Sequence, residues 1–140
     1  FLNSDASLQA DAADILWIVD NVSYSREAKC NSANLALHAG DSVGLARDVV
    51  SDADKILALG VIGLERCRQY AIESGASEQD VEQHVIVHAH DKLLRLLPHF
   101  IRTEPGKRIA QPEHEVVART IRALEEKKEE QKTSAQTKIE

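Results

Sequence analysis

The second segment of the chain repeats small and aliphatic residues every seven positions. The small row holds Ala46, Ala53, Gly60 and Cys67, and the aliphatic row holds Val43, Val50, Leu57 and Leu64. Two rows with this period are the a and d positions of a helix packed as in a coiled coil. Small side chains along one row allow a neighbouring helix to approach closely. The pattern therefore predicts helical packing, and it predicts no chemistry.

Glycines and capping residues divide the chain into four expected helices, over about 4–39, 41–74, 77–101 and 112–124. Gly40 and Gly75 are typical left-handed stops at helix ends. Asp41 or Ser42 is expected to cap the second helix, and Ser77 begins a weak capping box for the third.

Prolines mark the remaining boundaries. Pro98 removes a backbone hydrogen bond and predicts a kink or an end near Leu97. The segment 103–110 contains Pro105 and Gly106 and predicts a loop. Pro112 suits the first turn of the last helix.

These expectations define an all-α fold: a long antiparallel helical hairpin plus two shorter helices, similar to a four-helix bundle. Residues 1–124 form one helical domain, and 125–140 form a charged helical C-terminal extension. The hairpin is too long for the two shorter helices to cover, which predicts a second chain on it. The alternative is that the long segments break at 23–25 and around Gly60 and Gly63, since interior glycine weakens a helix.

Composition limits the function. The net charge of -6 and the pI near 5.5 disfavour nucleic acid and anionic membranes as partners. No apolar run reaches the ~20 residues that span a bilayer, so we expect a soluble protein without membrane insertion. The chain begins at Phe1 and has no Met, which suggests a trimmed piece. The compartment stays open, with the cytoplasm slightly favoured.

A polar stripe on the third expected helix is a candidate metal site. His84 and His88 are four residues apart, and Asp80 and Asp91 fall on the same face. Imidazoles at this spacing, completed by carboxylates, can hold a divalent metal. The alternatives are a solvated polar face and a contact sensitive to protonation.

The two cysteines and the basic residues are weaker candidates. Cys30 and Cys67 would lie too far apart along the hairpin for a disulfide, and Cys67 is expected to be buried and inert. A basic cluster within 92–108 is a candidate anion-binding site; it consists of Lys92, Arg95, Arg102, Lys107 and Arg108. The alternative is that these basic residues neutralise the protein's own acidic tail.

The functional prediction is a non-enzymatic interaction or assembly module, a homo-oligomer and most simply a dimer, that binds a protein partner. Trp17, with Leu16 and Ile18, is the expected interface anchor, and the alternative is an ordinary core tryptophan. The second hypothesis is a metal-responsive or small-ligand sensor using the His84 and His88 face. No pattern of acid and base, phosphate loop or cofactor fingerprint supports catalysis or a cofactor.

Overall fold

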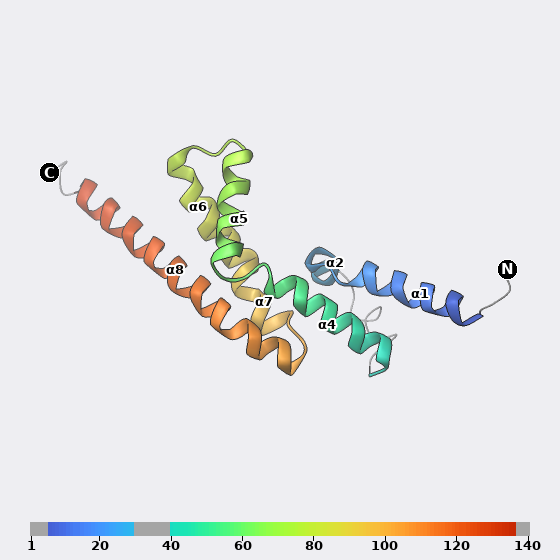
Figure 1. Ribbon diagram of the computed structural model, residues 1–140. Coiled ribbons are helices and arrows are strands. Elements are labelled where there is room, and N and C mark those ends of the chain that lie inside the picture. The colour runs from blue at the N-terminus through green and yellow to red at the C-terminus, as the bar shows by residue number, and fades with distance from the viewer. Residues whose placement is uncertain (1–5, 30–39, 137–140) are drawn as a thin grey trace.

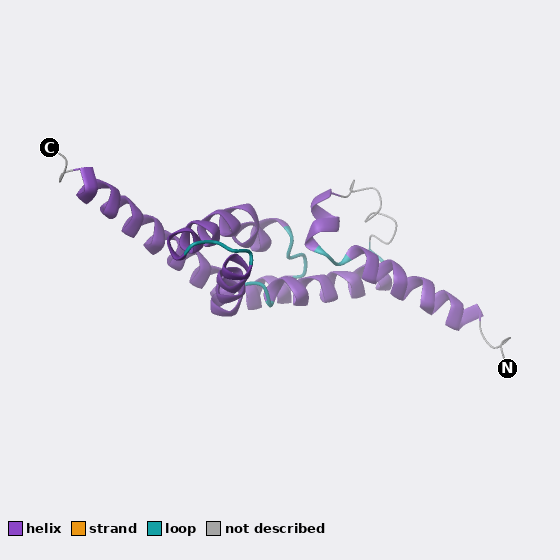
Figure 2. Ribbon diagram, turned by 90° about the horizontal axis from the view of Figure 1, so that it is seen from above, coloured by secondary structure: helices purple, strands orange, loops and turns teal. Residues whose placement is uncertain are grey.

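The structure is a computed structural model that describes residues 6–29 and 40–136. Its elements are α1 (Ala6–Asn21), α2 (Tyr24–Lys29), α4 (Ser42–Ile56), α5 (Gly60–Glu73), α6 (Glu78–His88), the π-helix η1 (Ala89–Leu93), α7 (Leu94–His99) and α8 (Glu104–Gln136). The described ranges contain helices and no strand, so the all-α prediction is confirmed there. Figures 1 and 2 show α1 and the end of α8 extending in opposite directions from a centre where α5, α6 and α7 gather.

The expectation of one helix over 41–74 is wrong, because the chain turns between α4 and α5. Gly60 adopts a φ of 68° at the start of α5. A Cβ at Gly60 would collide with the side chain of Glu113, and one at Gly63 would collide with the carbonyl of Ala58. Gly63 therefore permits a close backbone approach that other residues would prevent, and Gly60 permits the positive φ of the turn. The alternative that placed a break around these glycines is the correct one.

The first segment also breaks, close to residues 23–25 where the alternative interpretation placed a break. α1 ends at Asn21, and Ser23 caps α2 by accepting a hydrogen bond from the backbone N–H of Arg26 at 3.2 Å. α1 packs beside α4, and Figure 1 shows both running toward the centre of the molecule. They therefore do not form the long antiparallel hairpin expected from the sequence. Residues 30–39 of that expected helix lie outside the described residues.

At the other boundaries the stop at Gly75 and the cap at Asp41 are confirmed, the capping box at Ser77 is not formed, and the helix expected before Gly40 lies outside the described residues. Gly40 and Gly75 have φ values of 86° and 85°. The Asp41 carboxylate accepts a hydrogen bond from the N–H of Gly44 at 2.7 Å and caps α4. Ser77 is the N-cap residue of α6, although its hydroxyl contacts the Asp80 carboxylate instead of a backbone amide. Local side-chain chemistry therefore fixes these boundaries.

The loop expected over 103–110 is instead the first part of α8, which begins at Glu104. The Thr103 hydroxyl accepts from the N–H of Gly106 at 3.0 Å and donates to Asp52 at 2.7 Å. Pro105 lies in the first helical turn, where its missing N–H costs nothing. The cap on Thr103 and its contact with α4 therefore start the helix eight residues before Pro112.

The third expected helix is divided by the π-helix η1 and ends near its proline. α7 contains Pro98 and stops at His99, which lies between Leu97, where a kink or an end was expected, and residue 101, where the expected range closes. In η1 the extra residue of a π-helical turn shifts which side chains face the neighbouring helices. This turn carries Lys92, whose ammonium lies 5.2 Å from the centre of the Tyr24 ring.

The apolar core lies on the side of α6, η1, α7 and α8. Its buried members are Leu59, Val85, Ile86, Ala89, Leu93, Leu96, Ile101, Ala110, Val117 and Ile121. α5 packs most closely against α6 and α8, and α1 packs against α4. Among the described residues, no helix is both long enough and apolar enough to cross a membrane. The core thus holds the α5–α8 part together. α1 attaches through α4, and α2 also reaches the core through Tyr24, whose ring packs on Phe100 and whose hydroxyl donates to the Asp91 carbonyl.

The turn between α4 and α5 yields a prediction about Gly63. Gly63→Ala should lower the free energy of unfolding by about 2 to 4 kcal/mol, because its Cβ would collide with the backbone carbonyl of Ala58. Gly40→Ala is the comparison: its φ is positive, but a Cβ there would meet no atom within 4 Å. Urea unfolding should show the larger loss for Gly63→Ala. Equal losses would mean that the contact with Ala58 is unimportant.

Candidate functional site

The inner face of α4 is polar. Arg47, Ser51, Asp52 and Lys55 are all buried, and Arg47 and Lys55 are only 2% and 1% exposed. Three of them, Arg47, Ser51 and Lys55, follow one another at intervals of four and so share one face of the helix. Two buried cations require a buried anion, which the neighbouring helix α2 provides.

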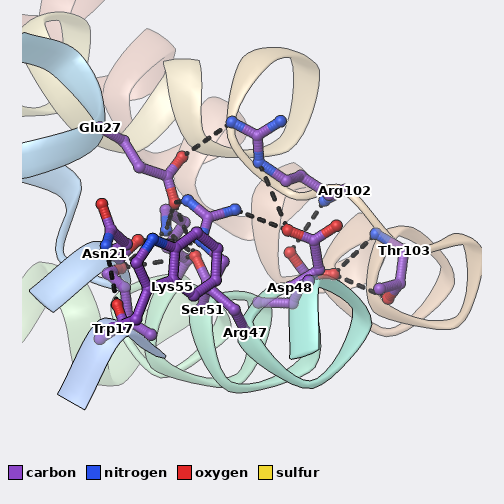
Figure 3. A network of polar contacts seen from close by, with 12 residues as sticks. Trp17, Asn21, Glu27, Arg47, Asp48, Ser51, Lys55, Arg102 and Thr103 are labelled. Atoms are coloured by element: carbon purple, nitrogen blue, oxygen red, sulfur yellow. Dashed lines mark hydrogen bonds and ion pairs between the residues drawn. The ribbon is translucent and has the colours of Figure 1, made fainter. Parts of the chain in front are cut away.

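The Glu27 carboxylate of α2 neutralises this face (Figure 3). Its Oε1 accepts from Arg47 at 2.5 Å, from Ser51 at 2.8 Å and from Lys55 at 3.0 Å. Lys55 also donates to the Ser51 hydroxyl and to the Val22 carbonyl. Arg47 additionally donates to the backbone carbonyl of Asn21 at 2.9 Å. The cluster therefore joins the end of α1, and α2 through Glu27, to α4.

Burial raises the pKa of Glu27, but the hydrogen bonds from Lys55 and Ser51 and the charges of Lys55 and Arg47 outweigh it. The resulting pKa lies below the ordinary value of 4.5. Glu27 is therefore ionised at neutral pH despite its burial.

A second group of contacts joins α4 to the start of α8. The Asp52 carboxylate accepts from the backbone N–H groups of Arg102 and Thr103, each at 2.8 Å. The Arg102 guanidinium reaches Glu27 at 3.3 Å and Asp48 at 3.8 Å. A Cβ at Gly106 would collide with the Asp52 side chain, so glycine is required at this contact. Figure 3 shows the two groups side by side along α4.

The heptad pattern predicted the wrong buried face for α4. Ala46, Val50, Ala53 and Leu57 are exposed, whereas Gly60 is buried and Leu64 and Cys67 are partly buried. The exposed apolar surface, which we name the α4 seam, consists of Leu45, Ala46, Val49, Val50, Ala53 and Leu57. Its large members are 49% to 65% exposed. Charged residues hold the inner face, so the apolar rows face outward.

A second exposed apolar surface lies on α1. This α1 stripe consists of Ile15, Leu16 and Val19, whose side chains are 59% to 66% exposed. Of the three residues predicted as interface, Leu16 belongs to the stripe, and Trp17 and Ile18 are half-buried beside it. The backbone carbonyl of Trp17 accepts from the Asn21 side chain at 2.7 Å.

A pocket of about 390 Å³ opens between α5, α6 and η1. Its polar lining residues are Asp54, Arg66, Cys67, Tyr70, His84, His88 and Lys92. The predicted ligands Asp80 and Asp91 are not part of the lining, and Asp80 is bonded to Ser77. Within residues 6–29 and 40–136, no three histidine, cysteine or carboxylate side chains are grouped closely enough to hold a metal ion.

Burial and positive charge shape the electrostatics of this pocket. Burial lowers the pKa of His88, and Lys92 lowers it further, against the opposing effect of Asp91. Burial raises the pKa of the Cys67 thiol, against the effects of Lys92 and Arg66. His88 is therefore neutral and Cys67 is a thiol at neutral pH. Cys67 is unpaired, and Cys30, the other member of the excluded disulfide, lies outside the described residues.

The residues of the predicted basic cluster serve different local contacts. Lys107 pairs with Glu104 at 2.8 Å, and Arg102 pairs with Glu27 and Asp48. Arg95 donates to the carbonyl of Asp91 at 3.4 Å, and Arg108 is exposed. Lys92 is the member of this cluster that lines the pocket.

Sequence reasoning missed Glu27 as a buried anion and Arg66 and Tyr70 as pocket residues. The spacing of four from Arg47 to Ser51 to Lys55 was available as a signal, because it places three polar residues on one helical face. Arg66 and Tyr70 have the same spacing on α5. Glu27 carried no comparable signal, since its partners lie 20 to 28 residues away in the sequence.

The chain is similar to the uncharacterized protein YpgQ of Bacillus subtilis (strain 168). The two are 28% identical over 115 residues, which is 82% of this chain and 52% of YpgQ. The chain thus spans about half the length of the curated relative that it matches. No family model matches it, and no solved structure matches it.

The buried cluster yields a prediction about Glu27. Glu27→Gln should lower the free energy of unfolding at pH 7 by about 3 to 5 kcal/mol, because it leaves Arg47 and Lys55 buried without an anion. Since the folded pKa lies below 4.5, the contribution of Glu27 is complete above that pH and is lost as the pH falls through the folded pKa.

Urea unfolding of the two proteins at neutral and acidic pH measures this difference. The gap between the wild-type protein and Glu27→Gln should narrow toward acid. The exposed Glu65→Gln is the control and should show no such gap. A gap of constant size down to pH 3 would contradict the electrostatic explanation.

Proposed function

We propose that this chain is a non-enzymatic interaction and assembly module that forms a homodimer through the α1 stripe. The observation that supports the proposal is the run of three large aliphatic side chains, Ile15, Leu16 and Val19, each more than half exposed. Contiguous apolar surface of this kind typically marks a protein contact. Trp17 and Ile18 flank the stripe and would extend the contact.

Charge sets how such a dimer responds to salt. Asp11 and Asp20 lie on the two edges of the α1 stripe and are exposed. Pairing two copies of α1 brings these aspartates together, and salt screens their repulsion.

The dimer proposal is tested by the mass of the native particle. Leu16→Gln should shift the particle toward monomer in light scattering, while circular dichroism keeps its helical content, because the side chain is exposed in the single chain. Ile109→Gln is the matched control, since Ile109 is 59% exposed on α8 and outside the stripe. A wild-type particle with the mass of one chain at high salt would overturn the proposal.

The pocket supports a second candidate, binding of a small anion as a ligand sensor. Arg66 and Lys92 bring two positive charges to a concave site, with the Tyr70 hydroxyl and two imidazoles beside them. In the described part of the chain, neither cation lies within 4 Å of a carboxylate oxygen. Asp54 is the opposing charge in the lining. This combination suits a phosphate or carboxylate group, whereas two imidazoles alone leave a divalent metal short of ligands.

Inorganic phosphate is a direct probe of this pocket. Millimolar phosphate should raise the thermal midpoint, since a ligand of the folded state stabilises it, and Lys92→Gln should remove most of the shift. The paired Lys107→Gln is the matched control. Binding should strengthen below pH 6.5 as His88 gains a proton, because its folded pKa lies under that value. A shift with zinc but not phosphate, lost on replacing His84 and His88 by Ala, would favour the metal.

A further inference from the structure

The charged residues that line the pocket come from different helices. Arg66 belongs to α5 and Lys92 to η1, whereas Asp54 belongs to α4. Among the residues that the structure describes, Asp54 forms no ion pair with either cation, since no nitrogen of the two lies within 4.0 Å of its carboxylate. One carboxylate and two cations therefore line the same space without neutralising one another.

The Lys92 ammonium is held in place by an aromatic ring. It lies 5.2 Å from the centre of the Tyr24 ring, which itself packs on Phe100. The Tyr24 hydroxyl donates to the Asp91 carbonyl at 3.1 Å, which fixes the ring further. An aromatic face attracts a cation but carries no net charge to cancel it. Lys92 thus keeps its full charge for a ligand while its position is fixed.

The pocket has room for more than a phosphate group. Its volume of about 390 Å³ falls within the range of roughly 300 to 1,000 Å³ that is typical of small-molecule sites. Apolar side chains also contribute to the lining, namely Ala58, Ala71 and Leu93. A ligand that fills this volume therefore carries carbon atoms in addition to its anionic group.

The charges of the lining indicate a ligand with opposite charges at its two ends. Arg66 and Lys92 together match a phosphate monoester, which carries a charge of about −1.5 to −2 at neutral pH. The Asp54 carboxylate repels such an anion unless a positive group of the same ligand lies beside it. Inorganic phosphate uses only the two cations and leaves Asp54 without a partner.

We propose that the pocket binds a small phosphomonoester that carries an ammonium group a few carbon atoms from its phosphate. Arg66 and Lys92 hold the phosphate, and the Asp54 carboxylate accepts hydrogen bonds from the ammonium group. The inference rests on the second candidate function, anion binding in this pocket, and adds to it the chemical class of the ligand.

Two probes of similar size test the inference. Phosphoethanolamine carries an ammonium group, and ethyl phosphate has the same carbon chain without it. In calorimetric titrations of the whole chain, phosphoethanolamine should bind about tenfold tighter, because only its ammonium group can bond to Asp54. Equal affinities would overturn the inference and leave anion binding intact. Binding of neither probe would overturn both.

Variants separate the two ends of the ligand. Asp54 is exposed, so Asp54→Asn keeps the fold. It should weaken phosphoethanolamine about tenfold, whereas ethyl phosphate should bind no more weakly than before. Lys92→Gln should weaken both probes alike, because it acts on the phosphate alone.

Glu65→Gln is the matched control for the loss of a negative charge. Glu65 precedes Arg66 in the sequence but lies outside the lining, so the preference for phosphoethanolamine should persist in this variant. A preference that survives Asp54→Asn would overturn the inference, and so would an equal loss of preference in Glu65→Gln.

Discussion

The attachment of the N-terminal helices depends on one buried carboxylate. Glu27 accepts from Arg47, Ser51 and Lys55 of α4 and is reached by Arg102, which directly precedes the cap of α8. Burying each charge costs hydration free energy that only its partners offset. Helices α2 and α4 and the start of α8 must therefore be in place together before every charge of the cluster has its partners. Hydrogen bonds and ion pairs between polar side chains, and not apolar packing, thus fix the geometry of the contact between Glu27 of α2 and α4.

This cluster explains why α4 presents its apolar side outward. A helix can bury either face, and here the face with Arg47, Ser51 and Lys55 is required for attachment of α1 and α2. The same helix also holds the start of α8 through Asp52. With both neighbours engaged by polar side chains, the heptad residues Ala46, Val50, Ala53 and Leu57 are left exposed in the described chain. The apolar periodicity of α4 therefore does not build the core of this fold.

The sequence allowed prediction of the features that depend on local chemistry. Asp41 and Gly75 act on residues next to them, so their positions sufficed. The start of α8 was missed because Thr103 is held by Asp52, 51 residues away in the sequence. The same distinction between local and long-range features applies to the pocket. The spacing of His84 and His88 correctly predicted that they share a helix face, because that depends on one helix alone. Arg66 and Tyr70 join them only through the packing of α5 on α6.

Asp54 sets the charge balance of the pocket. It lines the pocket together with Arg66 and Lys92. An anion in the pocket is attracted by the two cations and repelled by the Asp54 carboxylate, so Asp54 opposes the binding that Arg66 and Lys92 favour. Substitution of Asp54 by asparagine should therefore tighten the binding of phosphate.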